Sequence, residues 1–166
     1  REKITVSFVL GILNAERTLV QCLEGIFMQD YPLSKYEVII VDGGSTDNTL
    51  SIIKEYMKKN SNIRLLHNPY KLAEGIGMSK DIGVNNAKGK IVIFLDHDNI
   101  VKDKNWLNEM LYPFKDREIM ATQSLLSYSK DETYFLKYIN AVGVEDPFAI
   151  PYSLVSHVQL YPSKFK

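Results

Sequence analysis

The residues best suited to chemistry in this chain end an apolar run, in the stretch IVIFLDHDNI at 91–100. Asp96 and Asp98 flank His97 there. Two carboxylates so close together repel, and each disfavours the ionised form of the other. A bound divalent cation would offset this repulsion, because hard cations such as Mg²⁺ prefer carboxylate oxygens. The alternative is a strand that runs out into a solvated polar turn.

Neighbouring side chains on an extended chain point in opposite directions. We therefore expect Asp96 and Asp98 to face a site, and His97 to point away as a structural residue. A calcium-binding EF-hand loop is excluded here, because Val101 and Leu107 stand where that loop needs glycine and glutamate.

A second polar stretch, VDGGSTDNT at 41–49, joins an apolar run to a helical pattern. Its two glycines permit backbone angles that other residues avoid, and Thr46 or Asp47 is suited to cap the helix that follows. Helix capping does not require Asp42. A carboxylate at that position could accept hydrogen bonds from a nucleobase edge or a ribose.

A third stretch, GIGMSKDIGVNNAKG at 75–89, is rich in glycine but is not a dinucleotide-binding fingerprint, since Lys80 replaces the third glycine. Lys80 could reach a phosphate or lie on a solvated helix face. Gly83 predicts close packing of this helix.

Glu145 and Asp146 precede Pro147 in the stretch GVEDPFAI. Asp146 is a candidate general base, which must lie within hydrogen-bond reach of the proton that it removes. The alternative is a polar turn set by the proline.

The elements that would position these residues follow from hydrophobic patterning. Nearly continuous apolar runs predict buried strands at 4–10, 36–41, 63–66 and 90–95, and helical periodicity lies between and after them, at 15–28, 48–59, 75–87 and 104–114. This alternation predicts an α/β fold with a mostly parallel central sheet and helices on both faces. All the polar stretches that follow strands then open on one edge of the sheet, where ligands of such folds bind.

Beyond Phe114 the pattern is weaker: 119–128 suggests a fifth strand, 132–143 a short helix and 144–163 irregular structure. By length, residues 1–166 form a single domain. The chain begins with Arg1 rather than Met, so we expect a fragment of a longer protein.

The 166 residues carry 20 basic and 20 acidic side chains, and this balance gives no indication of a nucleic-acid partner. One cysteine, Cys22, excludes an internal disulfide and fits a reducing compartment. No apolar run approaches the roughly 20 residues of a membrane-spanning helix. We expect a cytoplasmic protein, with any membrane association through regions outside this chain.

Together, the stretch QDYPLSKYEVIIVDGGSTDNT and the Asp-x-Asp of FLDHDN resemble the family-2 glycosyltransferases, nucleotide-sugar enzymes of the Rossmann-like GT-A fold. The resemblance covers roughly residues 4–115. It implies that 1–115 form a donor-binding half and 116–166 the start of an acceptor-side region. It differs from the family after the first strand, where Gly11 and Leu13 replace a proline and an aromatic residue.

The resemblance implies a role for each candidate residue. Asp96 and Asp98 would bind Mn²⁺ or Mg²⁺ against the sugar diphosphate. The donor would contact Asn14, Glu16, Asp42, Lys80, Asp81 and Asp96. Transfer would go to a carbohydrate hydroxyl or a lipid-linked phosphate acceptor, with inversion, at the cytoplasmic face of a membrane if the acceptor is a lipid.

Two other functions compete with this one. FLDHDN also resembles the haloacid-dehalogenase motif, in which Asp96 would attack a phosphate and Asp98 would serve as acid and base. The chain could also be a non-catalytic module that binds sugar nucleotides.

Overall fold

The computed structural model describes residues 4–70, 75–124 and 158–162. The chain divides into two compact units, Arg1–Lys104 (unit 1) and Asn105–Lys166 (unit 2). The two halves that we expected to meet at 115/116 would divide within unit 2, because the two units meet at 104/105.

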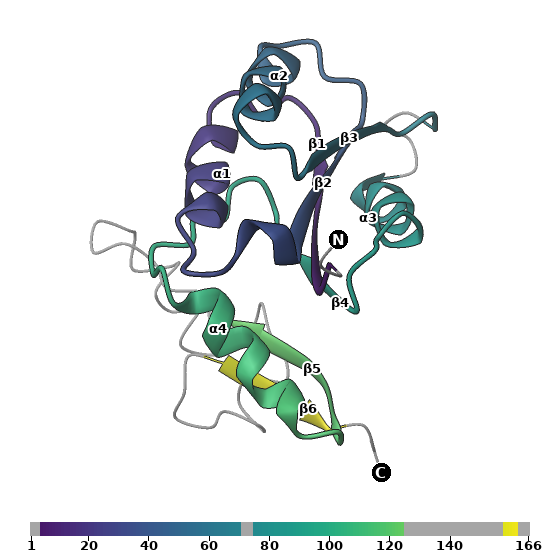
Figure 1. The fold of residues 1–166 in the computed structure, drawn as a ribbon. Coiled ribbons are helices and arrows are strands. Elements are labelled where there is room, and N and C mark those ends of the chain that lie inside the picture. Colours follow the sequence, from purple (N-terminus) through teal and green to yellow (C-terminus); the bar gives the residue numbers. More distant parts are fainter. Residues whose placement is uncertain (1–3, 71–74, 125–157, 163–166) are drawn as a thin grey trace, which may run out of the picture. The chain divides into compact units, whose positions relative to one another are not determined.

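Unit 1 is built on a four-stranded parallel sheet with the order β3-β2-β1-β4 (Figure 1). Its strands are β1 (Val6–Ile12), β2 (Tyr36–Asp42), β3 (Ile63–His67) and β4 (Ile91–Phe94). Its helices are α1 (Leu19–Phe27), α2 (Thr49–Lys59) and α3 (Gly75–Asn85), with a short 3₁₀ turn at Leu33–Lys35. The predicted α/β class with a parallel sheet is confirmed.

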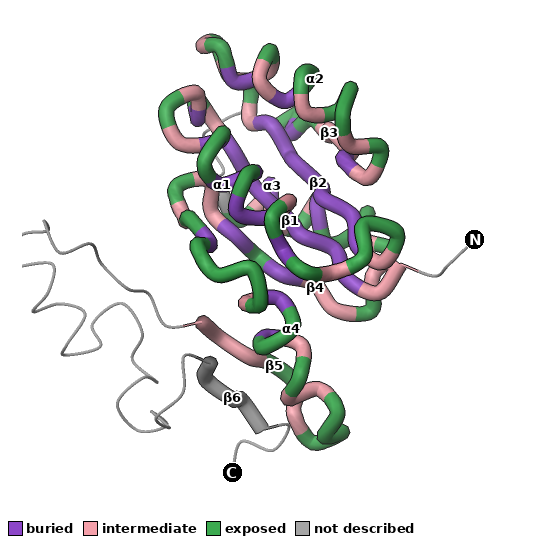
Figure 2. Tube along the Cα trace, turned by 60° about the vertical axis from the view of Figure 1, so that its left-hand side comes forward, coloured by how far each residue is buried: buried purple, intermediate pink, exposed green. Residues whose placement is uncertain are grey.

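Every residue of β1 and β2 is buried, as the continuous apolar runs predict for central strands (Figure 2). Helices α1 and α2 cover one face of the sheet and α3 covers the other (Figure 1). On the α1 face, the rings of Phe27 and Tyr36 lie 6.3 Å apart, and the Phe8 ring meets Tyr36 edge-on at 5.7 Å.

On the α3 face, Val9, Ile39 and Val41 form a buried cluster against which Ile82 packs. A Cβ at Gly83 would lie 2.3 Å from a methyl group of Val9. Helix α3 therefore approaches the sheet as closely as predicted, and only glycine fits at that contact.

The amino edge of the sheet holds a buried carboxylate, Glu37, which the sequence analysis did not single out. Its oxygens accept hydrogen bonds from Ser7 Oγ at 2.7 Å, the Lys88 amide at 2.7 Å and Arg64 Nη1 at 3.0 Å. Burial raises the pKa of Glu37, but these donors and the charge of Arg64 outweigh it and hold the pKa below its ordinary value.

Unit 2 contains α4 (Trp106–Leu111), a 3₁₀ turn (Tyr112–Lys115), and strands β5 (Ile119–Ser124) and β6 (Val158–Pro162). The predicted fifth strand is present. The expectation of irregular structure throughout 144–163 is wrong, because β6 pairs antiparallel with β5. Its proline is its last residue, where a missing amide donor does least harm to a strand. The helix expected at 132–143 lies outside the described residues.

Candidate functional site

The candidate residues of unit 1 gather at the carboxyl edge of the sheet. Asp42 ends β2, and Asp96 and Asp98 lie two and four residues beyond the end of β4. Strand β1 lies between β2 and β4, so the two acidic positions stand two strand spacings apart, roughly 10 Å. The chain order reverses between β1 and β4, and ligands of open α/β sheets bind at such a switch point.

Asp42 is 3% exposed, and its carboxylate is held by the turn that follows it. It accepts hydrogen bonds from the amides of Gly44 at 3.0 Å and Ser45 at 3.2 Å, and from Ser45 Oγ at 2.6 Å. Gly44 has a φ of 95°, which allows this tight turn. The carboxylate is therefore fixed in one orientation.

Asn14 links the loop after β1 to the loop after β2. It adopts a left-handed φ of 49°, which asparagine tolerates better than most residues. Its side-chain Oδ1 accepts a hydrogen bond from the backbone amide of Thr46 at 2.9 Å. The backbone amide of Asn14 donates to Ser45 Oγ, also at 2.9 Å.

Glu16 makes a second link between the same two loops. Its Oε2 accepts hydrogen bonds from the amide and the side chain of Asn48, both at 3.0 Å. In return, the Glu16 amide donates to Asp47 Oδ2 at 3.2 Å. Asp47 also accepts from the Thr49 amide at 3.0 Å, at the start of α2. The N-cap of α2 is Asn48 rather than Thr46 or Asp47, so the predicted cap position is wrong. The pKa of Asp47 is lowered, because bonds from Thr49 and from nearby amides outweigh its desolvation.

Asp96 forms an ion pair across the α3 face of the sheet. Lys80 Nζ lies 3.0 Å from Asp96 Oδ1, and the two side chains are 30% and 48% exposed. The same ammonium lies 5.9 Å from the centre of the Phe94 ring. The structure thus brings together two candidates sixteen positions apart in sequence, whereas Asp81 lies exposed on α3.

His97 points to the opposite side from Asp96, because its Nδ1 lies 2.8 Å from Thr18 Oγ1, just before α1. Asp98 is exposed and accepts a hydrogen bond from Asn99 Nδ2 at 3.1 Å. Cys22 is buried below this loop. Burial, together with the charges of Asp98 and Asp96, raises the pKa of its thiol to about 12, so it stays protonated at neutral pH.

The acidic pair suits a hard divalent cation. Both groups offer carboxylate oxygens at an accessible position, and their closeness is unfavourable without a nearby positive charge. Among the described residues, no group of three or more His, Cys, Asp or Glu side chains forms a complete cage. Two carboxylates are nevertheless enough for Mg²⁺ or a similar ion, which takes its remaining ligands from water and substrate phosphates.

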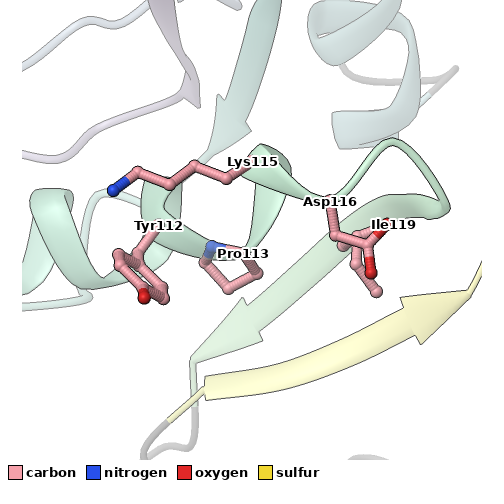
Figure 3. A pocket seen from close by; sticks show the side chains of 5 residues that line it. All are labelled: Tyr112, Pro113, Lys115, Asp116 and Ile119. Atoms are coloured by element: carbon pink, nitrogen blue, oxygen red, sulfur yellow. The ribbon is translucent and has the colours of Figure 1, made fainter.

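Glu145 and Asp146 are outside the described residues. Unit 2 carries an open hollow of about 300 Å³, lined by Tyr112, Pro113, Lys115, Asp116 and Ile119 (Figure 3). None of the candidate residues lines it.

The sequence analysis missed several residues that position the site. Ser45 was not singled out, yet its hydroxyl bridges Asp42 and the backbone amide of Asn14. Buried Asn68 was not noticed; its amide donates to the Asp42 carbonyl at 2.8 Å, and its side chain donates to Ser79 Oγ of α3 at 3.1 Å. Their signal was a polar residue directly after or near a strand end.

Comparison with known proteins identifies the family. The family model described as "Glycosyl transferase family 2" matches residues 7–163. The chain belongs to glycosyl transferase family 2. Its membership sets aside the haloacid-dehalogenase alternative, and the match extends beyond the resemblance expected over 4–115.

Curated relatives agree with this assignment. The chain is 33% identical over 137 residues to glycosyltransferase GlyG of Streptococcus pneumoniae, covering 81% of the chain and 43% of GlyG. It is 30% identical over 106 residues to a poly(ribitol-phosphate) beta-glucosyltransferase of Bacillus spizizenii, covering 62% of the chain and 17% of that protein. The chain thus spans less than half the length of these relatives.

Solved structures show the same GT-A fold. TarS 1–349 of Staphylococcus aureus, in complex with UDP, matches with a TM-score of 0.61 and 28% identity over 69% of the chain and 33% of its own. A mannosyltransferase from Pyrobaculum calidifontis matches with a TM-score of 0.69 and 23% identity, over 78% and 37%. In the part of the family-2 chain that the structure describes, no helix combines the length and apolar character needed to cross a membrane.

Proposed function

We propose that this chain forms the donor-binding part of a glycosyltransferase that moves a sugar from a nucleoside diphosphate to a hydroxyl or lipid-phosphate acceptor, with inversion. The observation that carries this proposal is the position of Asp42 and of the Asp96–Asp98 pair, on either side of β1 at one edge of the sheet. A site for a nucleoside diphosphate needs one region that binds the base and ribose and another that binds the diphosphate.

On the β2 side, Asp42 would bind the base or the ribose. Three donors of its own loop already bond to the Asp42 carboxylate, and the Ser45 amide is shared between both oxygens, so a base or ribose would take over one of these contacts. Asn14 and Glu16 would belong to the donor site through the loop that they hold. The TarS structures support this side of the proposal, because they were solved with UDP and with UDP-GlcNAc.

On the β4 side, Asp96 and Asp98 would hold Mn²⁺ or Mg²⁺, and Lys80 and Asp81 would lie near the diphosphate. When bound, such an ion stabilises the negative charge on the departing diphosphate, by something like several kcal/mol. Lys80 would supply a second positive charge from α3, only 3.0 Å from Asp96. Asp146 is the proposed general base for the acceptor hydroxyl.

The acceptor proposal draws on the names of relatives. One acts on poly(ribitol-phosphate), and a Methanococcus voltae relative, 39% identical over 90 residues, is named for a dolichyl phosphate sugar. A polyol-phosphate hydroxyl or a lipid-linked sugar would fit this chain, at the cytoplasmic face of a membrane.

Calorimetric titration with UDP-sugars and GDP-sugars, with and without Mn²⁺, tests the proposal. We expect one nucleotide class to bind, and to bind more tightly with Mn²⁺. Failure of every sugar nucleotide to bind would overturn the donor site, and equal affinity with and without the ion would overturn the metal assignment. Release of nucleotide in the presence of acceptor would distinguish an enzyme from a non-catalytic binding module.

A further inference from the structure

The segment that follows β4 is held along one side of α1. This segment, 96–104, begins with the acidic pair and contains no helix or strand. Cys22 and Gly25 of α1 contact it, as do Thr18, directly before the helix, and Gln29, two residues beyond its end.

The first two contacts fix the stretch that carries the acidic pair. Thr18 Oγ1, just before α1, lies 2.8 Å from His97 Nδ1. One turn further along, Cys22 Sγ lies 3.6 Å from the Asp96 carbonyl oxygen, to which it donates a weak hydrogen bond. The side chain between the two aspartates and the backbone of the first are thus both fixed to α1.

The next two contacts hold the continuation of the segment. A Cβ at Gly25 would lie 2.6 Å from the Val101 carbonyl oxygen, so the segment packs against the bare helix backbone there. Gln29 Nε2 then donates to the Asp103 carbonyl at 2.8 Å and to the Gly25 carbonyl at 3.0 Å.

The four positions Thr18, Cys22, Gly25 and Gln29 are spaced by four, three and four residues. Cys22 and Gly25 share one side of α1, and Thr18 and Gln29 continue that row into the residues just before and just after the helix. We call this row the α1 stripe. Three of these contacts fix backbone atoms of 96–103 and one fixes His97, so the stripe sets the path of the segment and contacts neither the Asp96 nor the Asp98 carboxylate.

We propose that the α1 stripe positions the carboxylates of Asp96 and Asp98 for a divalent cation. This inference rests on the proposed function. His97 is turned toward α1 by Thr18, while Asp96 faces α3, where Lys80 lies 3.0 Å away. Partners behind the ligands of a metal ion typically change its affinity by roughly 10- to 100-fold when they are removed.

The test measures the affinity of the full protein for Mn²⁺ in the presence of UDP, by electron paramagnetic resonance, and for UDP alone in EDTA. Thr18→Val removes the hydroxyl at nearly constant volume, and we expect Mn²⁺ to bind roughly tenfold more weakly. Thr18→Ser restores the hydroxyl and should recover the affinity to within about twofold. Gly25→Ala forces the segment outward and should weaken Mn²⁺ binding without involving His97.

The affinity for UDP in EDTA should be the same in all variants, because the base would bind on the β2 side of β1. Gln21→Ala, on the exposed side of α1, is the matched control and should bind Mn²⁺ as the unsubstituted protein does. Unchanged Mn²⁺ affinity in both Thr18→Val and Gly25→Ala overturns this inference alone. An unsubstituted protein that binds UDP but no Mn²⁺ overturns the proposed metal assignment and this inference with it.

Discussion

Glu37 and Asp96 are carboxylates at opposite edges of the same sheet, and their surroundings differ sharply. The Glu37 side chain is 2% exposed and bonded by a hydroxyl, an amide and a guanidinium. The Asp96 side chain is 48% exposed, and it forms an ion pair with Lys80, which is itself 30% exposed. A buried carboxylate must be fully bonded to be tolerated, whereas Asp96 retains oxygens that could bind a ligand.

The comparison teaches which acidic residue serves the fold and which serves a site. Glu37 joins β1, β2, β3 and the turn before β4, since its donors come from Ser7, Arg64 and Lys88. Removing Glu37 should lower the stability of the protein without changing its affinity for a ligand. Removing an acidic residue at the carboxyl edge should weaken ligand binding and leave the stability unchanged.

The largest effect is expected for Glu37→Gln. The amide keeps the size of the side chain but leaves Arg64 without its buried counter-ion and sets an NH₂ group against hydrogen-bond donors. We expect the free energy of unfolding to fall by about 3 kcal/mol, as measured by urea denaturation. Glu55→Gln, which breaks an exposed ion pair with Lys58, is the control and should leave the urea concentration at the midpoint of unfolding unchanged. Equal midpoints for both variants would contradict a structural role for Glu37.

Asp98→Ala should have the next largest effect, and on binding rather than stability. Asp98 is exposed, so its loss should not change urea denaturation. Removing a direct ligand should cost at least as much as removing a partner behind it, so we expect Mn²⁺-dependent donor binding to weaken roughly 100-fold in calorimetry. Glu24→Ala, on the exposed side of α1, is the control. If Asp98→Ala bound donor and Mn²⁺ normally, the pair would be a solvated turn.

A smaller effect is expected for Lys80→Met. An ion pair this exposed contributes roughly 0–1 kcal/mol to stability, so unfolding should hardly change. Loss of a positive charge near the diphosphate should weaken donor binding about tenfold at low salt, and less as KCl screens the charge. Lys80→Arg should keep most of the affinity. A donor affinity in Lys80→Met that equals the unsubstituted value at low salt would remove Lys80 from the site.

The smallest effect is expected in the dependence of stability on pH. The pKa of Glu37 is lowered in the folded protein from an ordinary 4.5, so the unfolded chain takes up the proton first as the pH falls. The stability that Glu37 contributes is therefore complete above its unfolded pKa and is lost as the pH falls through the folded value. Urea denaturation between about pH 6 and pH 3 should show a shallower loss of stability for Glu37→Gln than for the unsubstituted protein. Parallel curves would assign the acid sensitivity to other carboxylates.

Much of unit 1 could be predicted from the sequence because its signals are local. The runs that became β1 and β2 are continuously apolar, and strands buried on both faces need no polar alternation. Helix ends were less well predicted: α1 begins at Leu19 rather than near Ala15, because the backbone amides of Ala15 and Glu16 instead bond to Thr49 and Asp47, at the start of α2 and in the loop before it. In unit 2, β6 was missed because its pairing with β5 is a contact between distant segments.

By itself, the sequence determined the fold class, the family, and which edge of the sheet carries Asp42 and the acidic pair. These follow from the order of strands and helices, since parallel strands bring their carboxyl ends to one side. Only the tertiary structure decided how each side chain is used. The contacts of His97 with Thr18 and of Thr46 with Asn14 join residues 79 and 32 positions apart. No local pattern encodes such contacts, because they exist only once the helices have packed on the sheet.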